Sequence, residues 1–237
     1  MNPSLASNQK TGPAPASMKF KKPPGAALRK ALLFCGLLSS LWYVTINIIV
    51  PVQYPGYSTV SQTVSELSAI EAPTRKLWTL LSLPYSLLVL AFAWGVAQAG
   101  GGRQPLRTVS VLLFVYGVSD LLWPLASMHQ RPVLAAGGGT LTDTLHIAFS
   151  IATVLLMVLM MGFAAAAFGK SFRLYSVLTL ILLLGFGALT GVDAPKMVAN
   201  QPTPWMGVWE RISIGVFMIW LMVLAARLLR SKKSTAT

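Results

Sequence analysis

The sequence predicts an all-α fold, a polytopic transmembrane helix bundle of six spans with both termini in the cytoplasm. Three observations predict this fold. Of the 237 residues, 54% are hydrophobic and only 11% are charged, whereas about a quarter of the residues in soluble domains are charged. Six apolar runs approach or exceed the ~20 residues that a helix needs to cross about 30 Å of hydrocarbon. Lysine and arginine also collect on one side of these runs.

The apolar runs divide the chain into a basic N-terminal arm (residues 1–30), a six-helix transmembrane domain (31–230) and a cytoplasmic tail (231–237). The arm is rich in Pro, Ser, Ala and Lys, so we expect it to be disordered. The first run is long enough to span and no small-residue cleavage site follows it, which favours an uncleaved helix over a signal peptide. The predicted spans are residues 31–50, 77–99, 106–128, 142–168, 174–192 and 205–229.

Basic residues predict the orientation of these spans. Fourteen of the 19 lysines and arginines fall in the terminal segments and in the two short loops on the same side. Five fall on the opposite side, namely Arg75, Lys76, Arg131, Lys196 and Arg211. The positive-inside rule then predicts a multi-pass protein of the cell (inner) membrane, with both termini inside. The net charge of +13 is therefore a topology signal, and we do not expect nucleic-acid binding.

The longest loop on the outer side covers residues 51–76. Within it, Ser58–Ile70 has the pattern of a short amphipathic helix, since Val60, Val64 and Leu67 recur at helical spacing. We expect this helix to lie at the membrane interface or to fold over the mouth of the bundle.

All six acidic residues and both histidines map to the outer loops or to the outer halves of the spans. Polar groups inside a membrane are costly and usually face a partner, so this segregation is the strongest functional signal in the chain. It predicts a polar pocket open to the outside. The predicted pocket residues are Asp120, Asp143, His146, Glu210 and Arg211, with Ser65 and Glu66 as a roof.

Asp143, His146 and Ser150 share one helix face at spacings of three and four residues. In an enzyme, His146 would act as a base or metal ligand, and Asp120 and Asp143 would orient it or bind the metal. Ser150 or Ser119 would be the nucleophile. The candidate zinc ligands are His146, Asp120, Asp143 and Glu210, although a single histidine within a span is few for a zinc site.

Three functions stay open at this point. The first is binding or transport of a lipid or small molecule by the outward-facing pocket. The second is an intramembrane hydrolase or lipid-modifying enzyme, with or without a metal. The third is a structural or sensor protein whose charges tie helices together. The lipid bilayer is the partner that the composition implies, no cofactor is evident, and the oligomeric state stays open.

Several segments together resemble one family. They are Ser65-Glu66-Leu67-Ser68 followed by Pro73, Asp120 near the end of its span, Thr142–His146 and Gly207–Ile212. In combination they look like the DUF998 family of small, mostly prokaryotic integral membrane proteins of unknown function. The resemblance covers nearly the whole chain after residue 30. It implies a six-helix membrane protein and supplies no established catalytic residues.

Overall fold

The computed structural model describes residues 25–231, and all regular structure within this range is helical. Six helices are long and apolar enough to cross a membrane, when α3 is taken with the short 3-10 helix that follows it. The six are α1 (Ala26–Val52), α2 (Arg75–Ala99), α3 (Gln104–Leu122), α5 (Leu141–Ala167), α6 (Lys170–Val198) and α7 (Met206–Arg230). Each corresponds to one predicted span.

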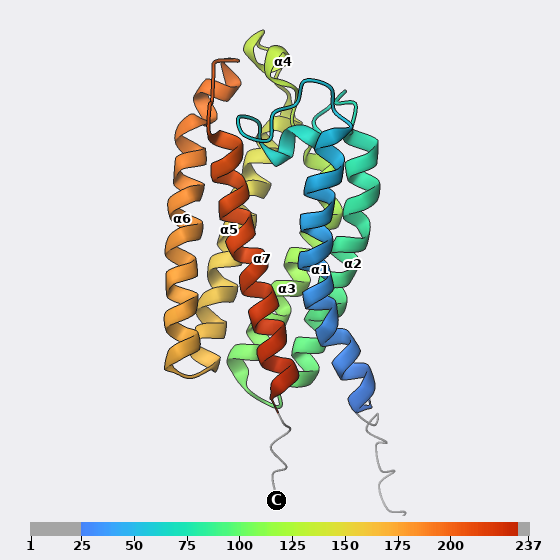
Figure 1. Cartoon of the computed structure of the whole chain (residues 1–237), viewed down its shortest axis with the longest axis vertical. Helices are drawn as coiled ribbons and strands as arrows, with labels where there is room; N and C mark the ends of the chain where they lie inside the picture. The colour runs from blue at the N-terminus through green and yellow to red at the C-terminus, as the bar shows by residue number, and fades with distance from the viewer. Residues whose placement is uncertain (1–24, 232–237) are drawn as a thin grey trace, which may run out of the picture.

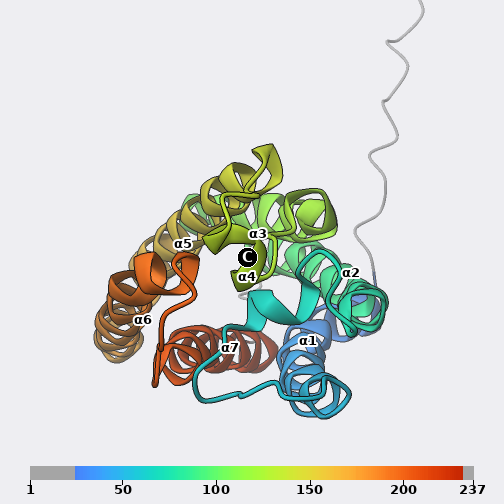
Figure 2. The ribbon, with the colours of Figure 1, turned by 90° about the horizontal axis from the view of Figure 1, so that it is seen from above.

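These six helices form a closed ring in the order α1, α2, α3, α5, α6, α7, in which α7 packs back against α1 (Figures 1 and 2). Both ends of the described chain lie at one end of the ring, together with the two tight turns (Figure 1). We call this the terminal end. The longer loops and the short helix α4 (Arg131–Ala135) lie at the opposite end, which we call the loop end (Figure 1).

The helix boundaries differ from the prediction where hydropathy alone is a poor guide. α1 begins at Ala26, so residues 26–30 of the predicted disordered arm are helical, and residues 1–24 lie outside the described range. α6 continues to Val198 because a helix can extend beyond the apolar stretch that defines a span. α3 ends at Leu122 instead of residue 128, because Pro124 lacks an N–H and the chain tightens into a 3-10 helix, Trp123–Ala126.

The predicted amphipathic helix at residues 58–70 is wrong over most of its length. Only Val64–Ser68 is helical, as a single 3-10 helix, η1. Val64 and Leu67 are buried, as the pattern predicted, but Val60 is 42% exposed. Residues before η1 do not form a helix because their carbonyl groups accept hydrogen bonds from α7. For example, Val60 O accepts the N–H of Val208 at 3.1 Å.

The apolar core extends from the middle of the ring toward the terminal end. Its largest fully buried side chains include Trp220 and Phe217 of α7 and Phe92 of α2. Polar links cross this core: the hydroxyls of Tyr85 and Tyr116 lie 2.8 Å apart and join α2 to α3.

Glycine sets the distance between α1 and α2. A Cβ at Gly95 would lie 2.9 Å from the backbone of Leu32 and Leu33, closer than real Cβ contacts. From the other helix, a Cβ at Gly36 would lie 2.7 Å from the Phe92 ring. Small residues of this kind let membrane helices approach closely, and the gain comes from van der Waals packing.

Gly95→Ala should therefore destabilise the bundle. The added methyl group meets backbone atoms that cannot rotate away, so we expect the free energy of unfolding to fall by about 1–3 kcal/mol. The control is Gly162→Ala on α5, where an added Cβ meets nothing within 4 Å. Thermal unfolding in detergent compares them, and equal melting temperatures of the two variants would contradict the packing argument.

Candidate functional site

A polar segment closes the loop end of the ring. We call residues Tyr57–Ser68 the lid; it includes η1. Arg131 of α4 binds the lid through a bidentate ion pair with Glu66. Its Nε lies 2.7 Å from Oε1 and its Nη2 lies 2.9 Å from Oε2. Arg131 also donates from Nη1 to Thr203 Oγ1 at 2.8 Å and from Nη2 to Ser61 O at 3.0 Å. One guanidinium thus joins three loops.

Burial and hydrogen bonding act in opposite directions on Glu66, whose exposed fraction is 4%. Burial raises the pKa of its carboxyl group, but hydrogen bonds from Arg131, Gln62 and the Thr63 N–H more than offset this effect. The net pKa lies below its ordinary value, so the ionised form is the one that the fold stabilises.

α7 holds the lid from the other side. Arg211 Nη1 donates to the carbonyl oxygens of Thr59 at 2.9 Å and Gln62 at 2.8 Å, and Nη2 donates to Tyr57 Oη at 2.6 Å. Glu210 accepts the N–H of Val64. The two side chains diverge on their helix, yet both bind the same segment.

Asp143 and His146, predicted to face one pocket with the residues above, instead fix the chain around α4. Asp143 accepts the backbone N–H of His129 at 2.7 Å, the N–H of Thr140 at 2.8 Å and Nδ1–H of His129 at 2.8 Å. His146 Nδ1 lies 2.9 Å from Ala126 O, and because a carbonyl oxygen only accepts, Nδ1 carries the proton.

Asp143, His146 and Ser150 do not form a hydrogen-bonded chain, although their spacing on one helix face allowed for one. Ser150 Oγ donates to the backbone oxygen of His146, one turn earlier in the same helix, at 2.8 Å. Helical spacing predicted a shared face correctly, but each of the three side chains binds a backbone group instead of the next side chain.

The candidate zinc ligands do not gather either. Within residues 25–231, no group of three or more His, Cys, Asp and Glu side chains is arranged to hold a metal ion. His146, Asp120, Asp143 and Glu210 are separated because Glu210 binds the lid, Asp143 binds the start of the α4 loop, and Asp120 lies deeper between α2 and α3.

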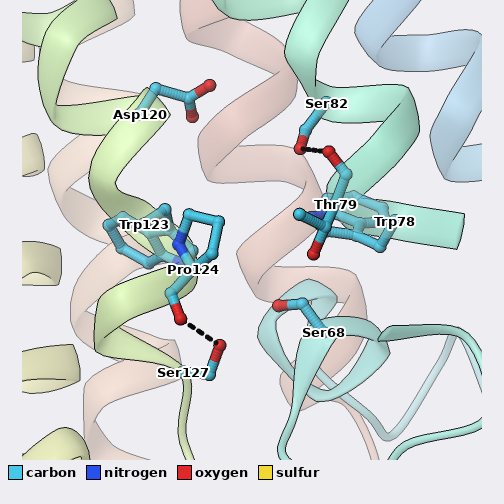
Figure 3. Close-up of a pocket in the computed structure, with 8 residues that line it drawn as sticks. All are labelled: Ser68, Trp78, Thr79, Ser82, Asp120, Trp123, Pro124 and Ser127. Atoms are coloured by element: carbon cyan, nitrogen blue, oxygen red, sulfur yellow. Dashed lines mark hydrogen bonds between the residues drawn. The ribbon is translucent and has the colours of Figure 1, made fainter. Parts of the chain in front are cut away.

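Asp120 lines a small polar cavity beneath the lid (Figure 3). The cavity has a volume of about 20 Å³, which is room for roughly one water molecule. The other predicted pocket residues, Ser65 and Glu66 included, are not in its lining. Its walls come from η1, α2, α3 and the segment that follows α3: Ser68, Trp78, Thr79, Ser82, Asp120, Trp123, Pro124 and Ser127.

One hydroxyl contacts the Asp120 carboxylate. Ser86 Oγ makes a short contact with Oδ2 and also lies 3.2 Å from Ser82 O. A serine hydroxyl has one proton, so Ser86 can donate to only one of these two oxygens at a time. Two ion pairs and one contact between a histidine and an acid occur among the described residues, and Asp120 takes part in none of them.

Arg131 is the residue that sequence reasoning missed. Its partner Glu66 lies 65 positions away in the chain, and no local pattern marks the pair. The available signal was indirect: Arg131 is one of only five basic residues on the side that holds every acid.

The Glu66–Arg131 pair predicts how stability depends on pH. Because the pKa of Glu66 is lowered in the fold, its contribution is complete above the ordinary value of 4.5 and is lost as the pH falls through the folded pKa. Arg131→Gln should flatten this acid-side dependence and lower the free energy of unfolding near pH 7 by about 3 kcal/mol, because it leaves a buried charge unpaired.

Thermal unfolding between about pH 3 and about pH 7 measures both effects. Lys76→Gln is the control, since it removes an exposed positive charge from the same end of the bundle. A variant at Arg131 that keeps the wild-type pH slope would show that the ion pair does not stabilise the lid.

Comparison with known proteins gives one match. No curated protein and no solved structure matches the chain. The family described as "Protein of unknown function (DUF998)" matches residues 37–227. This range begins within α1, ends within α7 and contains the lid, the α4 loop and Asp120, together with every segment on which the resemblance rested. The protein thus belongs to the DUF998 family of unknown function.

Proposed function

We propose that this membrane protein binds a small polar solute at Asp120 and takes it up from the outer side of the cell (inner) membrane. The observation that carries the proposal is the position of Asp120. Its carboxylate lines a polar cavity under the lid, it has no ion-pair partner among the described residues, and the helix that carries it is apolar enough to span. Ionisable groups within membrane spans are rare and usually functional.

The size of the cavity favours a small solute over a lipid. About 20 Å³ admits one water-sized group, whereas a lipid needs a far larger groove. The lining is also rich in hydroxyls, with Ser68, Thr79, Ser82 and Ser127 in the walls of the cavity (Figure 3).

Charge distribution supports an outward-facing loop end. All six acids lie in loops or helix segments of the loop-end half of the bundle. The basic residues described at the terminal end are Arg29, Lys30, Arg103, Arg107, Lys170, Arg173, Arg227 and Arg230. By the positive-inside rule, this asymmetry supports cytoplasmic termini and a cavity beneath the outer surface.

A structural role for the other charges accompanies this function. Glu66, Arg131, Glu210 and Arg211 all bind the lid or its neighbours, which supports the interpretation of these charges as ties. A hydrolase has less support, because His146 and Ser150 are hydrogen-bonded to backbone groups and not to each other's side chains.

Thiol labelling tests the orientation. Cys35 is the only cysteine, so the test uses a Cys35→Ser background with either Ala136→Cys at the loop end or Ser171→Cys at the terminal end; both positions are exposed. A membrane-impermeant thiol reagent should label position 136 in intact cells and position 171 only after the membrane is opened. The opposite pattern would reverse the topology.

A panel of small solutes tests binding. The panel contains sodium chloride, ammonium chloride, sodium formate and urea, added to the detergent-purified protein. At least one should raise the melting temperature of the wild type by about 2–4 °C, because a ligand that binds only the folded state stabilises it. Asp120→Asn should abolish the shift, and Asp193→Asn, whose acid pairs with Lys196 at 2.9 Å, should retain it. Identical responses of wild type and Asp120→Asn to every solute would contradict the proposal.

A further inference from the structure

We propose that the solute held at Asp120 is a small monovalent cation, bound between the lid, α2 and the segment that follows α3. This inference rests on the proposed function and names its ligand class. Three properties of the cavity carry it: the direction of its hydroxyl hydrogen bonds, its unbalanced charge and its size.

The serine hydroxyls around the cavity have already used their protons. Ser68 Oγ donates to Ser65 O, Ser82 Oγ to Thr79 O and Ser127 Oγ to Pro124 O, each at 3.1 Å. Figure 3 draws the last two of these bonds. A hydroxyl has one donor and two lone pairs, so each of these oxygens keeps acceptor capacity and has no proton left to give. Three separate segments therefore present acceptors to one cavity.

The lining holds one acid and no basic residue. Asp120 is the only ionisable side chain in it, and no Lys, Arg or His is among the eight. The side-chain donors left in the lining are the hydroxyl of Thr79 and the two indole N–H groups, of Trp78 and Trp123. Acceptors thus outnumber donors, and the best complement is a ligand that brings positive charge. An ionised carboxylate within a span is stabilised by such a counter-charge.

Charge and volume together define the class of cation. A monovalent ion neutralises Asp120, whereas a divalent ion would leave a net positive charge in a region of low dielectric constant. A volume of about 20 Å³ accepts an ion no larger than about one water molecule. Na⁺ meets both conditions, and choline, which has the same charge, is too large.

The test is a titration of detergent-purified full-length protein with sodium chloride against choline chloride at constant ionic strength and pH. Sodium should raise the wild-type melting temperature by about 2–4 °C over choline. Asp120→Asn should lose this difference. Ser82→Ala and Ser127→Ala, each of which removes one acceptor, should raise the sodium concentration for half-maximal shift by about fivefold. Ser61→Ala is the control, because its side chain lies outside the lining.

The outcomes separate the inference from the proposed function. Equal shifts of the melting temperature with sodium and with choline would contradict a bound small cation. An Asp120-dependent shift with formate or urea alone would keep the binding site and overturn its ligand class, and no Asp120-dependent shift with any solute would overturn both. A melting temperature that follows pH but not sodium would show that Asp120 takes up a proton instead. If Asp120→Asn does not fold, the two serine variants decide the result.

Discussion

The ion pair of Arg131 with Glu66 is the contact on which the loop end depends. A guanidinium presents five N–H donors in one plane, and here they reach the carboxylate, Ser61 O and Thr203 Oγ1 at once. The loops that it joins also bury apolar side chains, among them Leu67, Ala69 and Met128. The hydrophobic effect is not directional, so the charge-assisted hydrogen bonds of Arg131, which are directional, orient these loops relative to one another.

The lid in turn determines the shape and part of the lining of the cavity beneath it. Ser68, at the end of η1, forms part of the lining, so the position of the lid determines one wall. The lid reaches this position because Gly207 leaves room for it: a Cβ there would clash with the carbonyl oxygens of Thr59 and Gln62. Arg211 and Glu210 then bind the segment from α7. Most of the charged side chains that could have bound a ligand therefore hold the lid in place instead.

Only part of the site could be anticipated. Asp120 was predicted as a pocket residue from the segregation of the acids, and it lines the cavity. Ser68, Ser82 and Ser127 line the same cavity but were not singled out as pocket residues. Serine is common in membrane helices and has no period that marks a cavity. His146 and Asp143 were placed on the correct face and assigned to the wrong partners, since backbone groups of residues 126–140 bind them. Spacing along one helix does not reveal which neighbour approaches it.

The sequence by itself determined the number and approximate limits of the long helices and the segregation of acids from bases. These are properties of each segment alone: an apolar run of sufficient length must satisfy its own backbone hydrogen bonds, and a helix does so wherever it packs. Tertiary structure decided the order of the helices around the ring, the short η1 in place of a longer amphipathic helix, the pairing of Glu66 with Arg131, and the isolation of Asp120 from every cation among the described residues. Each of these depends on groups far apart in the chain, whose free energy of interaction exists only after the loops close.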